Sequence, residues 1–375
     1  GAPNPSIGVL VDEIDFSGLG MVATLFDVEQ IEVLRGPQGT RYGANALAGL
    51  IKVVTRAPRP ERERGVETSF GEDGLWSAGA VAGGALPAAA GDGAAWRVAL
   101  QRSASDGFRD NAFLGRDDTN ERDELTARAR LRLAPGAAWK LDLTLLYADL
   151  DNGYDAFAID NSYRTLSDRP GRDAQRSAGA ALDARYTPAA GLGVRSITSW
   201  SDTTLEASFD GDWGNDLDWG DAGPYDFFSR TLRERRTFAQ DLRLEGGAAD
   251  AGWVLGAYAL RLEEDNAQDD DGNYRGDRLV RSLDSRYRAT SLAVYGQADW
   301  ALTGATTLTA GLRFERRDAR YRDTDGVGFD PRDEMWGGQL SLSHAFGDAL
   351  RGWVSVSRGF KAGGFNIGAA IPAER

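Results

Sequence analysis

The sequence predicts a mainly β protein, in which a partial transmembrane antiparallel β-barrel follows a small α+β unit. Three observations predict this fold. After about Arg64, apolar and polar residues alternate with a period of two in many segments, as in strands with two different faces. The connections between these segments alternate between short and long. Residues 1–60 are compact, apolar and rich in glycine, which indicates a separate unit.

The alternation is clearest in residues 125–133. Leu131 and Leu133 fall on one face of this segment, whereas Arg130 and Arg132 fall on the other, because successive side chains of a strand point in opposite directions. About thirteen such strands are expected from the same period. They lie near 66–71, 76–86, 95–103, 125–133, 139–147, 176–187, 193–208, 231–245, 253–264, 287–302, 306–318, 335–345 and 352–360.

The connections indicate a membrane barrel. Short ones, rich in the Gly, Ala and Pro that suit hairpin turns, are expected at 134–138, 188–191, 246–252, 303–305 and 347–351. Long ones, rich in Asp, Asn, Gly and aromatic residues, are expected at 104–123, 149–175, 209–230, 265–286 and 319–334. Outer-membrane barrels combine short periplasmic turns with long extracellular loops in this way. The short connection at 71–75 is the one exception.

The two faces of each strand can be assigned from the cost of charge in lipid. An Arg or Lys that faces lipid at mid-depth costs about 2–4 kcal/mol, so the charged faces must point into the lumen. The expected lumen residues are Arg128, Arg130, Arg132, Asp241, Arg243, Glu245, Arg313 and Glu315. The expected lipid-facing residues are Leu131, Leu133, Leu242, Leu244, Leu312 and Phe314. A lumen with this many charged side chains must contain water or a plugging domain. The barrel must therefore be wide.

The chain divides into residues 1–60 and residues 61–375. Within the first unit we expect short strands at 7–11, 31–34 and 50–55 and a helical turn at 24–27. Residues 57–60, Ala-Pro-Arg-Pro, predict a linker, because proline lacks a backbone donor and interrupts helix and sheet. The chain starts without an export segment and ends without a strand-like closing sequence, so both ends are expected to be cut.

Composition excludes several classes of site. The chain has no Cys, a single His, His344, and a net charge of −14. Disulfides, thiolate metal sites and His-rich metal sites are therefore excluded, and we expect no metal and no cofactor. The acidic balance disfavours nucleic acid as a partner. The sequence also contains no nucleophile elbow, metal-ligand cluster or phosphate loop, so no enzymatic activity is expected.

The most specific motif lies within residues 28–55. Between two strand-like segments stand Arg35, Gly36, Pro37, Gly39, Tyr42, Gly43 and Gly49. Glycine permits positive φ and close backbone approach, and proline fixes a turn, so the chain can reverse tightly here. The motif closely resembles the plug signature of TonB-dependent outer-membrane receptors, in particular siderophore receptors. Residues 238–244, 310–314 and 357–366 resemble the barrel of that family, so the resemblance spans nearly the whole chain.

The resemblance implies a fold and a function. It implies the C-terminal part of a plug domain followed by the first part of a barrel, about thirteen of about twenty-two strands. The expected protein lies in the outer membrane of a Gram-negative bacterium, in contact with its lipid. It binds an extracellular small molecule, most commonly in this family an iron–siderophore complex, and imports it with energy from TonB. TonB, with ExbB and ExbD, would act through an N-terminal TonB box that this chain lacks.

The resemblance also implies charge pairs between plug and barrel. Arginines of the plug pair with carboxylates of the barrel wall in this family, and a charge inside a barrel needs a partner. The candidate arginines are Arg35 and Arg56, and the candidate carboxylates are Asp241, Glu245 and Glu315. The alternative interpretation places both arginines in solvent.

The loop at 209–228 is the richest candidate for ligand binding. It contains Trp213, Trp219, Tyr225, Phe227 and Phe228 among several aspartates. Aromatic rings in a hydrated cleft suit the faces of catecholates, sugars or macrocycles. The alternative is an aromatic belt at the membrane interface, where Trp and Tyr are enriched.

Two other functions remain open at this point. A passive outer-membrane porin would share the alternation and the loop asymmetry, but it does not need residues 28–55 as an independent apolar unit. A TonB-dependent transporter for a carbohydrate or cobalamin would share every motif named above. A soluble all-β enzyme would require a catalytic constellation, and scattered Asp and Glu residues select no particular pair.

Overall fold

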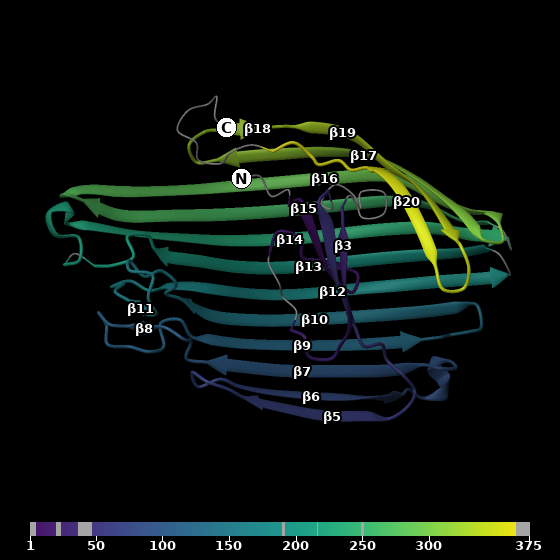
Figure 1. The fold of residues 1–375 in the computed structure, drawn as a ribbon, viewed down its shortest axis with the longest axis horizontal. Helices are drawn as coiled ribbons and strands as arrows, with labels where there is room; N and C mark the ends of the chain where they lie inside the picture. The colour runs from purple at the N-terminus through teal and green to yellow at the C-terminus, as the bar shows by residue number, and fades with distance from the viewer. Residues whose placement is uncertain are drawn as a thin grey trace.

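The computed structural model describes residues 5–19, 24–36, 47–189, 192–215, 217–248 and 251–364. Most of them belong to two β-sheets, and Figure 1 shows the smaller sheet crossing the middle strands of the larger one. The smaller sheet, here called the plug sheet, has the strand order β2-β1-β4-β3. Its strands are β1 (Ile7–Val11), β2 (Ile14–Asp15), β3 (Val28–Arg35) and β4 (Gly49–Thr55). β1 and β4 run parallel, and the other two pairs are antiparallel.

The larger sheet, here called the wall sheet, orders thirteen strands as they occur in the chain, each antiparallel to the next. They are β5 (Glu63–Phe70), β6 (Trp76–Ala85), β7 (Ala95–Ser105), β9 (Arg122–Leu133), β10 (Trp139–Tyr154), β12 (Gly171–Ala189), β13 (Leu192–Asp210), β14 (Tyr225–Ala248), β15 (Ala251–Tyr274), β16 (Asp277–Thr303), β17 (Thr306–Asp323), β19 (Arg332–Ala345) and β20 (Arg351–Arg358).

Smaller elements lie in the connections. β18 (Gly328–Phe329) pairs with β17, and β8 (Asp110–Asn111) pairs with β11 (Arg164–Thr165) in a separate two-stranded sheet. Two short 3₁₀ turns, η2 (Ala88–Ala90) and η3 (Gly220–Ala222), complete the described elements.

The expected fold class is confirmed. Each of the thirteen expected strands corresponds to one strand of the wall sheet. Within the described part of the chain, β5 and β20 stand at the two ends of the strand order, so the sheet forms part of a barrel and does not close on itself. Because Arg97 of β7, Arg235 of β14 and Lys361 all contact residues that flank the strands of the plug sheet, the wall curves around it.

Two expectations about local structure are wrong. The segment 265–286 was expected to be a long loop, but β15 and β16 continue through it to a two-residue turn at Arg275 and Gly276, both at positive φ. Polar side chains fall on both faces of this segment, and its few apolar residues do not alternate with them, so the pattern that indicates a strand is missing there. The helical turn expected at 24–27 is a non-helical turn that ends at Asp27 with positive φ, and β-strands are the only regular elements described in the plug part.

The faces of the wall are those expected from the cost of charge in lipid. On β17, Arg313 and Glu315 lie on the face that contacts the plug, here called the inner face, and both are buried. Leu312 and Phe314 lie on the opposite, outer face and are 44% and 53% exposed. Leu242 and Leu244 of β14 are exposed in the same way. Apolar side chains therefore cover the outside of this wall and charged side chains its inside.

No helix among the described residues is long and apolar enough to cross a membrane. The division expected between residues 60 and 61 stays a prediction.

Candidate functional site

The plug sheet packs against the inner face of the wall through an apolar cluster. Val11, Ile14 and Phe16 of the plug part are fully buried against Leu146 and Ala181 of the wall. Alternation on β1 and β4 provides the apolar side chains, and small residues on the wall provide the space for them. The plug therefore contacts this part of the wall through closely packed, buried apolar side chains.

Glycines on the wall let the plug come close. A Cβ at Gly179 of β12 would lie 3.0 Å from the Cγ2 of Ile14, and a Cβ at Gly79 of β6 would lie 2.6 Å from the ring of Phe26. Only glycine fits at Gly79 without displacement of the ring.

Next to the apolar cluster, one buried ion pair joins the two sheets. Arg97 of β7 donates from Nε to Oδ2 of Asp27 at 2.9 Å and from Nη2 to Oδ1 at 2.5 Å. The two side chains are 5% and 6% exposed. A planar guanidinium matches a carboxylate in this two-pronged geometry, so the pair fixes orientation as well as distance. Glu63 of β5 also contacts Arg97, which links the first strand of the wall to the same site.

Further wall arginines hold the plug by its backbone. Their guanidinium groups donate to carbonyl oxygens at the ends of plug strands and in plug turns. The pairs are Arg128 to Phe26, Arg130 to Thr55, Arg132 to Pro58, Arg233 to Gly18 and Arg235 to Ser17. Because these contacts use main-chain acceptors, they recognise the fold of the plug more than its side chains.

The turn between β1 and β2 connects the plug to the central strands of the wall. Asp12, at positive φ, accepts hydrogen bonds from the backbone N and the hydroxyl of Thr55 at 2.9 and 2.8 Å. Its neighbour Glu13 lies 3.2 Å from Lys52 of the plug and 3.4 Å from Arg195 of β13. Arg195 also pairs with Asp183 of β12 at 2.8 Å. One plug carboxylate thus belongs to a chain of charges that crosses between the sheets.

The charge pairs that the sequence suggested are not formed in the structure. Arg35 and Arg56 are exposed, and neither forms an ion pair with a carboxylate in the described ranges. Asp241 instead pairs with Arg243 of its own strand at 2.7 Å and accepts from the hydroxyl of Tyr295.

The other two suggested carboxylates have similar outcomes. Glu315 pairs with Arg313 at 2.9 Å, and Glu245 is exposed. The polarity is therefore the reverse of the expectation, because arginines of the wall meet carboxylates and carbonyls of the plug. The residues that the sequence reasoning missed are Glu13, Asp27, Arg97, Arg195 and Arg235.

The plug motif is described in part. Arg35 ends β3, Gly36 follows at φ +80°, and Gly49 begins β4 at φ +154°. The backbone N of Gly36 donates to the carbonyl of Ala48, which joins the two ends of the motif. Pro37, Gly39, Tyr42 and Gly43 lie outside the described residues.

The aromatic residues of the loop 209–228 do not form a single array. Trp213 stacks on Phe157 at a centroid distance of 5.1 Å, whereas Trp219 and Tyr225 meet edge to face at 5.3 Å. Phe228 lies under the guanidinium of Arg169. Among the five candidate rings, only Trp213 is exposed, at 43%. The loop is a packed unit with one ring presented to solvent.

Two buried aspartates organise this loop. Asp212 accepts hydrogen bonds from the backbone of Gly214 and Phe227 and from the indole of Trp219. Asp210 accepts from the backbone of Asp212 and Trp213. Burial, with the neighbouring Asp212 carboxylate as a smaller cause, raises the pKa of Asp210 to about 7.

Comparison with known families identifies the architecture. Residues 70–373 match the family described as "TonB dependent receptor-like, beta-barrel", and residues 1–50 match the TonB-dependent receptor plug domain. The chain belongs to the TonB-dependent receptor family. This family comprises transport receptors rather than enzymes.

Individual relatives of this TonB-dependent receptor chain agree with that assignment. The pesticin receptor of Yersinia enterocolitica is 25% identical over 387 residues, covering 97% of this chain and 54% of the relative. The vitamin B12 transporter BtuB of Photobacterium profundum is 29% identical over 143 residues, covering 38% and 22%. The solved structure of the ferric yersiniabactin uptake receptor FyuA from Yersinia pestis superposes with a TM-score of 0.82 at 22% identity, covering 97% and 57%. The chain thus spans about half the length of the relatives that it matches over most of its own length.

Between Trp200 and the aromatic loop, the outer face of β13 holds Asp202 and Glu206, which pair with Arg236 and Arg230. Exposed charge pairs at this height place the loop beyond the hydrocarbon layer. The choice between a ligand-binding surface and an aromatic belt at the membrane interface stays a prediction. The described residues contain no group of three or more His, Cys, Asp or Glu side chains that could hold a metal ion.

Proposed function

We propose that this chain forms part of an outer-membrane receptor that binds an iron–siderophore complex at its extracellular loops and imports it with energy from TonB. The observation on which this rests is the way the wall holds the plug sheet, by the buried Arg97–Asp27 pair and by hydrogen bonds to plug carbonyls. These contacts are numerous, polar and individually modest, so a pulling force can break them one after another. TonB, acting with ExbB and ExbD, is the partner that supplies this force in our proposal.

The plug sheet argues against a passive porin. A porin needs an open, water-filled lumen, whereas here Val11, Ile14 and Phe16 are fully buried against the wall. A solute can pass along this part of the wall only after the contact changes, and the change costs free energy that diffusion does not supply.

The choice of cargo follows the extent of similarity. The pesticin receptor and the ferric yersiniabactin uptake receptor resemble this chain over 97% of its length, whereas the cobalamin transporter resembles it over 38%. We therefore place an iron–siderophore complex first and cobalamin or a carbohydrate second.

The ligand surface in this proposal centres on Trp213. Its exposed ring is backed by Phe157, and the half-buried Trp219, Tyr225, Phe227 and Phe228 hold the loop in shape. A flat, rigid aromatic surface suits the face of a catecholate or a heteroaromatic siderophore.

The test is uptake by cells. A strain without the gene, complemented by the full-length gene, should take up radioactive iron from defined siderophores only when TonB is present. Uptake of cobalamin or of an oligosaccharide, with no uptake of iron, would support the second candidate cargo. Uptake that persists without TonB would support a passive porin and contradict the proposal.

A plug variant adds a structural arm to this test. Arg97→Gln leaves Asp27 buried without its charged partner, so the plug should loosen and large antibiotics should enter the cells more easily. The control is Arg102→Gln on the same strand, which removes an exposed pair with Asp123 and an exposed contact with the Trp76 ring, and no contact with the plug. Equal antibiotic resistance in both variants would contradict the role of the Arg97 contact.

A further inference from the structure

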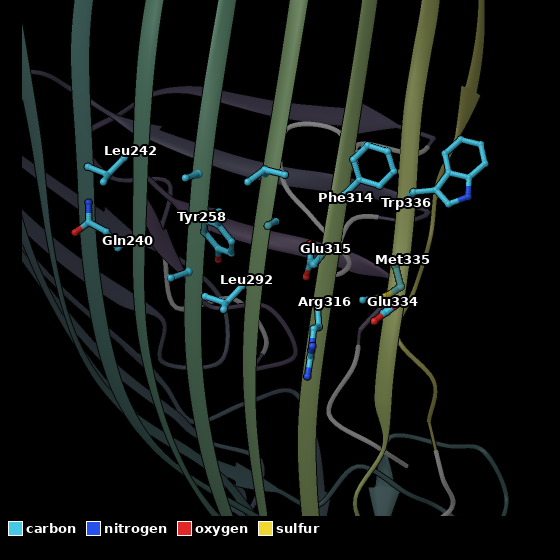
Figure 2. Close-up of a pocket in the computed structure, with 14 residues that line it drawn as sticks. Gln240, Leu242, Tyr258, Leu292, Phe314, Glu315, Arg316, Glu334, Met335 and Trp336 are labelled. Carbon is cyan, nitrogen blue, oxygen red and sulfur yellow. The ribbon is translucent and has the colours of Figure 1, made fainter.

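The outer face of the wall and the long loops present two very different surfaces. On the outer face, a pocket of about 810 Å³ lies among apolar side chains such as Leu242, Leu292 and Phe314, and Figure 2 shows it with the plug strands passing behind the wall. It belongs to the apolar band of this face, which on β16 runs from Leu292 to Trp300. A charged solute does not leave water for such a surface. The surface that a charged solute meets is therefore that of the loops.

The negative charge of the chain is concentrated at the end of the wall that carries the long loops. Residues 104–123, 149–175, 209–230, 265–286 and 319–334 together contain 29 Asp and Glu and 14 Arg and Lys. The rest of the chain contains 28 Asp and Glu and 29 Arg and Lys, so it is close to neutral, although the net charge of the whole chain is −14. A solute that approaches the loops therefore meets an acidic surface.

The excess of negative charge is most one-sided in the loop that holds Trp213. Residues 209–228 contain six Asp and no Arg or Lys. Arg169 of the neighbouring loop reaches this segment, but it pairs with Asp226 and Asp271. Its charge is thus compensated, and the surroundings of Trp213 stay negative.

Two carboxylates lie beside Trp213 without such compensation. Oδ2 of Asp218 lies 3.5 Å from the position that a Cβ would take on Gly214, the residue after Trp213. Ile159, which precedes Asp160, approaches the same position to 3.3 Å. Asp160 and Asp218 are exposed, and within the described ranges neither forms an ion pair. Their charges are therefore available to a solute at the exposed ring.

A buried carboxylate next to the ring has an oxygen without a partner. Asp210 is 6% exposed, and its Oδ1 accepts a hydrogen bond from the backbone N of Trp213 at 3.3 Å. Its Oδ2 has no hydrogen-bond partner among the described residues. In that part of the chain no group of three or more His, Cys, Asp or Glu side chains could hold a metal ion. Negative charge spread around an aromatic ring suits a bulky cation better than a bare metal ion.

We propose that the Trp213 ring, with the carboxylates of Asp160, Asp210 and Asp218 around it, selects a positively charged ferric complex and rejects negatively charged ones. A cationic group of the complex lies over the ring, between Asp160 and Asp218. This inference rests on the proposed function, for which it names the class of cargo. Anionic tris-catecholate and citrate complexes of iron belong to the class that the surface rejects.

Ring and carboxylates act in the same direction. The face of an aromatic ring is negative and attracts a cation, and the ring of Trp does so most strongly. The acidic loops extend this attraction beyond the site, because a surface of one sign raises the association rate of solutes of the opposite sign. An anionic complex is repelled during approach and again at the ring. An aromatic belt at the membrane interface would show no such dependence on the charge of a solute.

The experiment measures binding to the full-length receptor in detergent micelles by isothermal titration calorimetry. The probes are three ferric trihydroxamate complexes with the same iron centre and different tails. Ferrioxamine B has a positively charged ammonium tail, its N-acetyl derivative has a neutral tail, and its N-succinyl derivative has a negatively charged tail. We expect ferrioxamine B to bind more tightly than the succinyl derivative by about tenfold or more, with the acetyl derivative between them. Added salt should narrow this difference.

A pair of charge variants tests the carboxylates. Asp160→Asn with Asp218→Asn removes two charges and keeps an acceptor oxygen at each position. The preference for ferrioxamine B over the succinyl derivative should fall to about threefold or less. The matched control is Asp92→Asn with Asp348→Asn, which removes two exposed charges from short turns at the other end of the wall and should leave the preference unchanged.

A tryptophan variant tests the ring. Trp213→Leu should weaken binding of ferrioxamine B by about threefold or more, because the ring face that attracts the cation is lost. The matched control is Trp200→Leu, since Trp200 is also 43% exposed but lies on the outer face of β13. It should bind ferrioxamine B like the parent.

The outcomes are distinct. Tightest binding of the succinyl derivative, equal binding of the three complexes, binding of none, or an unchanged preference in the Asp160 and Asp218 variant overturns the inference. Iron uptake by cells separates it from the proposed function. A receptor that binds the complexes in the expected order but imports no iron when TonB is present contradicts the proposed function alone. A receptor that imports iron with TonB only as anionic complexes contradicts this inference alone.

Discussion

The inner and outer faces of the wall sheet are built from the same strands but hold opposite kinds of side chain. On β17, Arg313 and Glu315 are buried on the inner face, and Leu312 and Phe314 are exposed on the outer face one residue away. In a water-soluble protein the same alternation would place the leucine and phenylalanine inside. Alternation therefore indicates that a strand has two environments, and the cost of unpaired charge in lipid decides which environment each face meets.

The comparison also explains why the inner face tolerates so much charge. Buried inner-face arginines have partners, such as Glu315 for Arg313, Glu264 for Arg235 and Asp27 for Arg97. Pairing and hydrogen bonds offset much of the cost of desolvation there. On β15, the described outer face has no charged residue from Trp253 to Ala259, and charges follow toward the loops, at Arg261 and Glu263.

The largest expected effect comes from breaking a pair on the inner face. Arg313→Leu leaves Glu315 buried without a cation and should lower the free energy of unfolding by about 3–5 kcal/mol. The measurement is equilibrium unfolding of the full-length receptor in lipid vesicles by guanidinium.

The double variant Arg313→Leu with Glu315→Leu tests the reason for that loss. It removes both charges, so it should be more stable than the single variant by most of the same amount. A double variant as unstable as the single one would mean that packing around Arg313, between Tyr258 and Tyr295, matters more than charge.

A charge on the outer face should have the next largest effect. Leu312→Arg places a cation in the apolar band and should cost about 2–4 kcal/mol in the same unfolding assay. Val280→Arg serves as the control, because Val280 is exposed on the outer face of β16 beyond the band, and it should change stability by less than about 0.5 kcal/mol. Similar losses in both variants would mean that the outer face does not meet lipid.

The sequence allowed the strands and their faces to be predicted because both are local properties. Arg313 and Leu312 are neighbours, so their opposite environments can be inferred from alternation and one physical argument. The polar ends of β15 and β16 were missed because Asp269, Asp270 and Asp271 give no apolar period, although the strands continue there.

The partners across the plug–wall interface could not be predicted in the same way. Asp27 and Arg97, or Glu13 and Arg195, meet only when the plug sheet has one particular orientation inside the wall. That orientation depends on long-range packing, such as Phe26 against Gly79, to which no local pattern corresponds. The number of arginines on the inner face was the available signal that the wall provides the cations.

A close contact of the inner face gives a smaller effect. Gly79→Ala places a methyl group where the ring of Phe26 lies, and overpacking of this kind costs about 1–3 kcal/mol. Gly252→Ala is the control, because a Cβ there meets no atom within 4 Å. In a protein that already carries Phe26→Ala, the further change Gly79→Ala should not lower the free energy of unfolding. A loss that remains in that comparison would exclude this contact as its cause.

The smallest effect concerns the loop above the wall, where neither lipid nor the plug decides the environment. The pKa of Asp210 is about 7 in the folded loop, compared with 3.8 in an unfolded chain. Because the folded pKa is the higher one, the contribution to stability is complete below about pH 4 and is lost as the pH rises through about 7. Amide exchange at Trp213 and Phe227, corrected for its intrinsic pH dependence, should therefore be faster at pH 8 than at pH 5.

Asp210→Asn keeps the Oδ1 acceptor for the two backbone N–H groups but cannot ionise, so its exchange should not change over this range. Asp160→Asn should behave like the parent, because Asp160 is an exposed carboxylate of a neighbouring loop and accepts hydrogen bonds from Ser162 that lower its pKa. If Asp210→Asn kept the pH dependence of the parent, another group than Asp210 would have to open the loop.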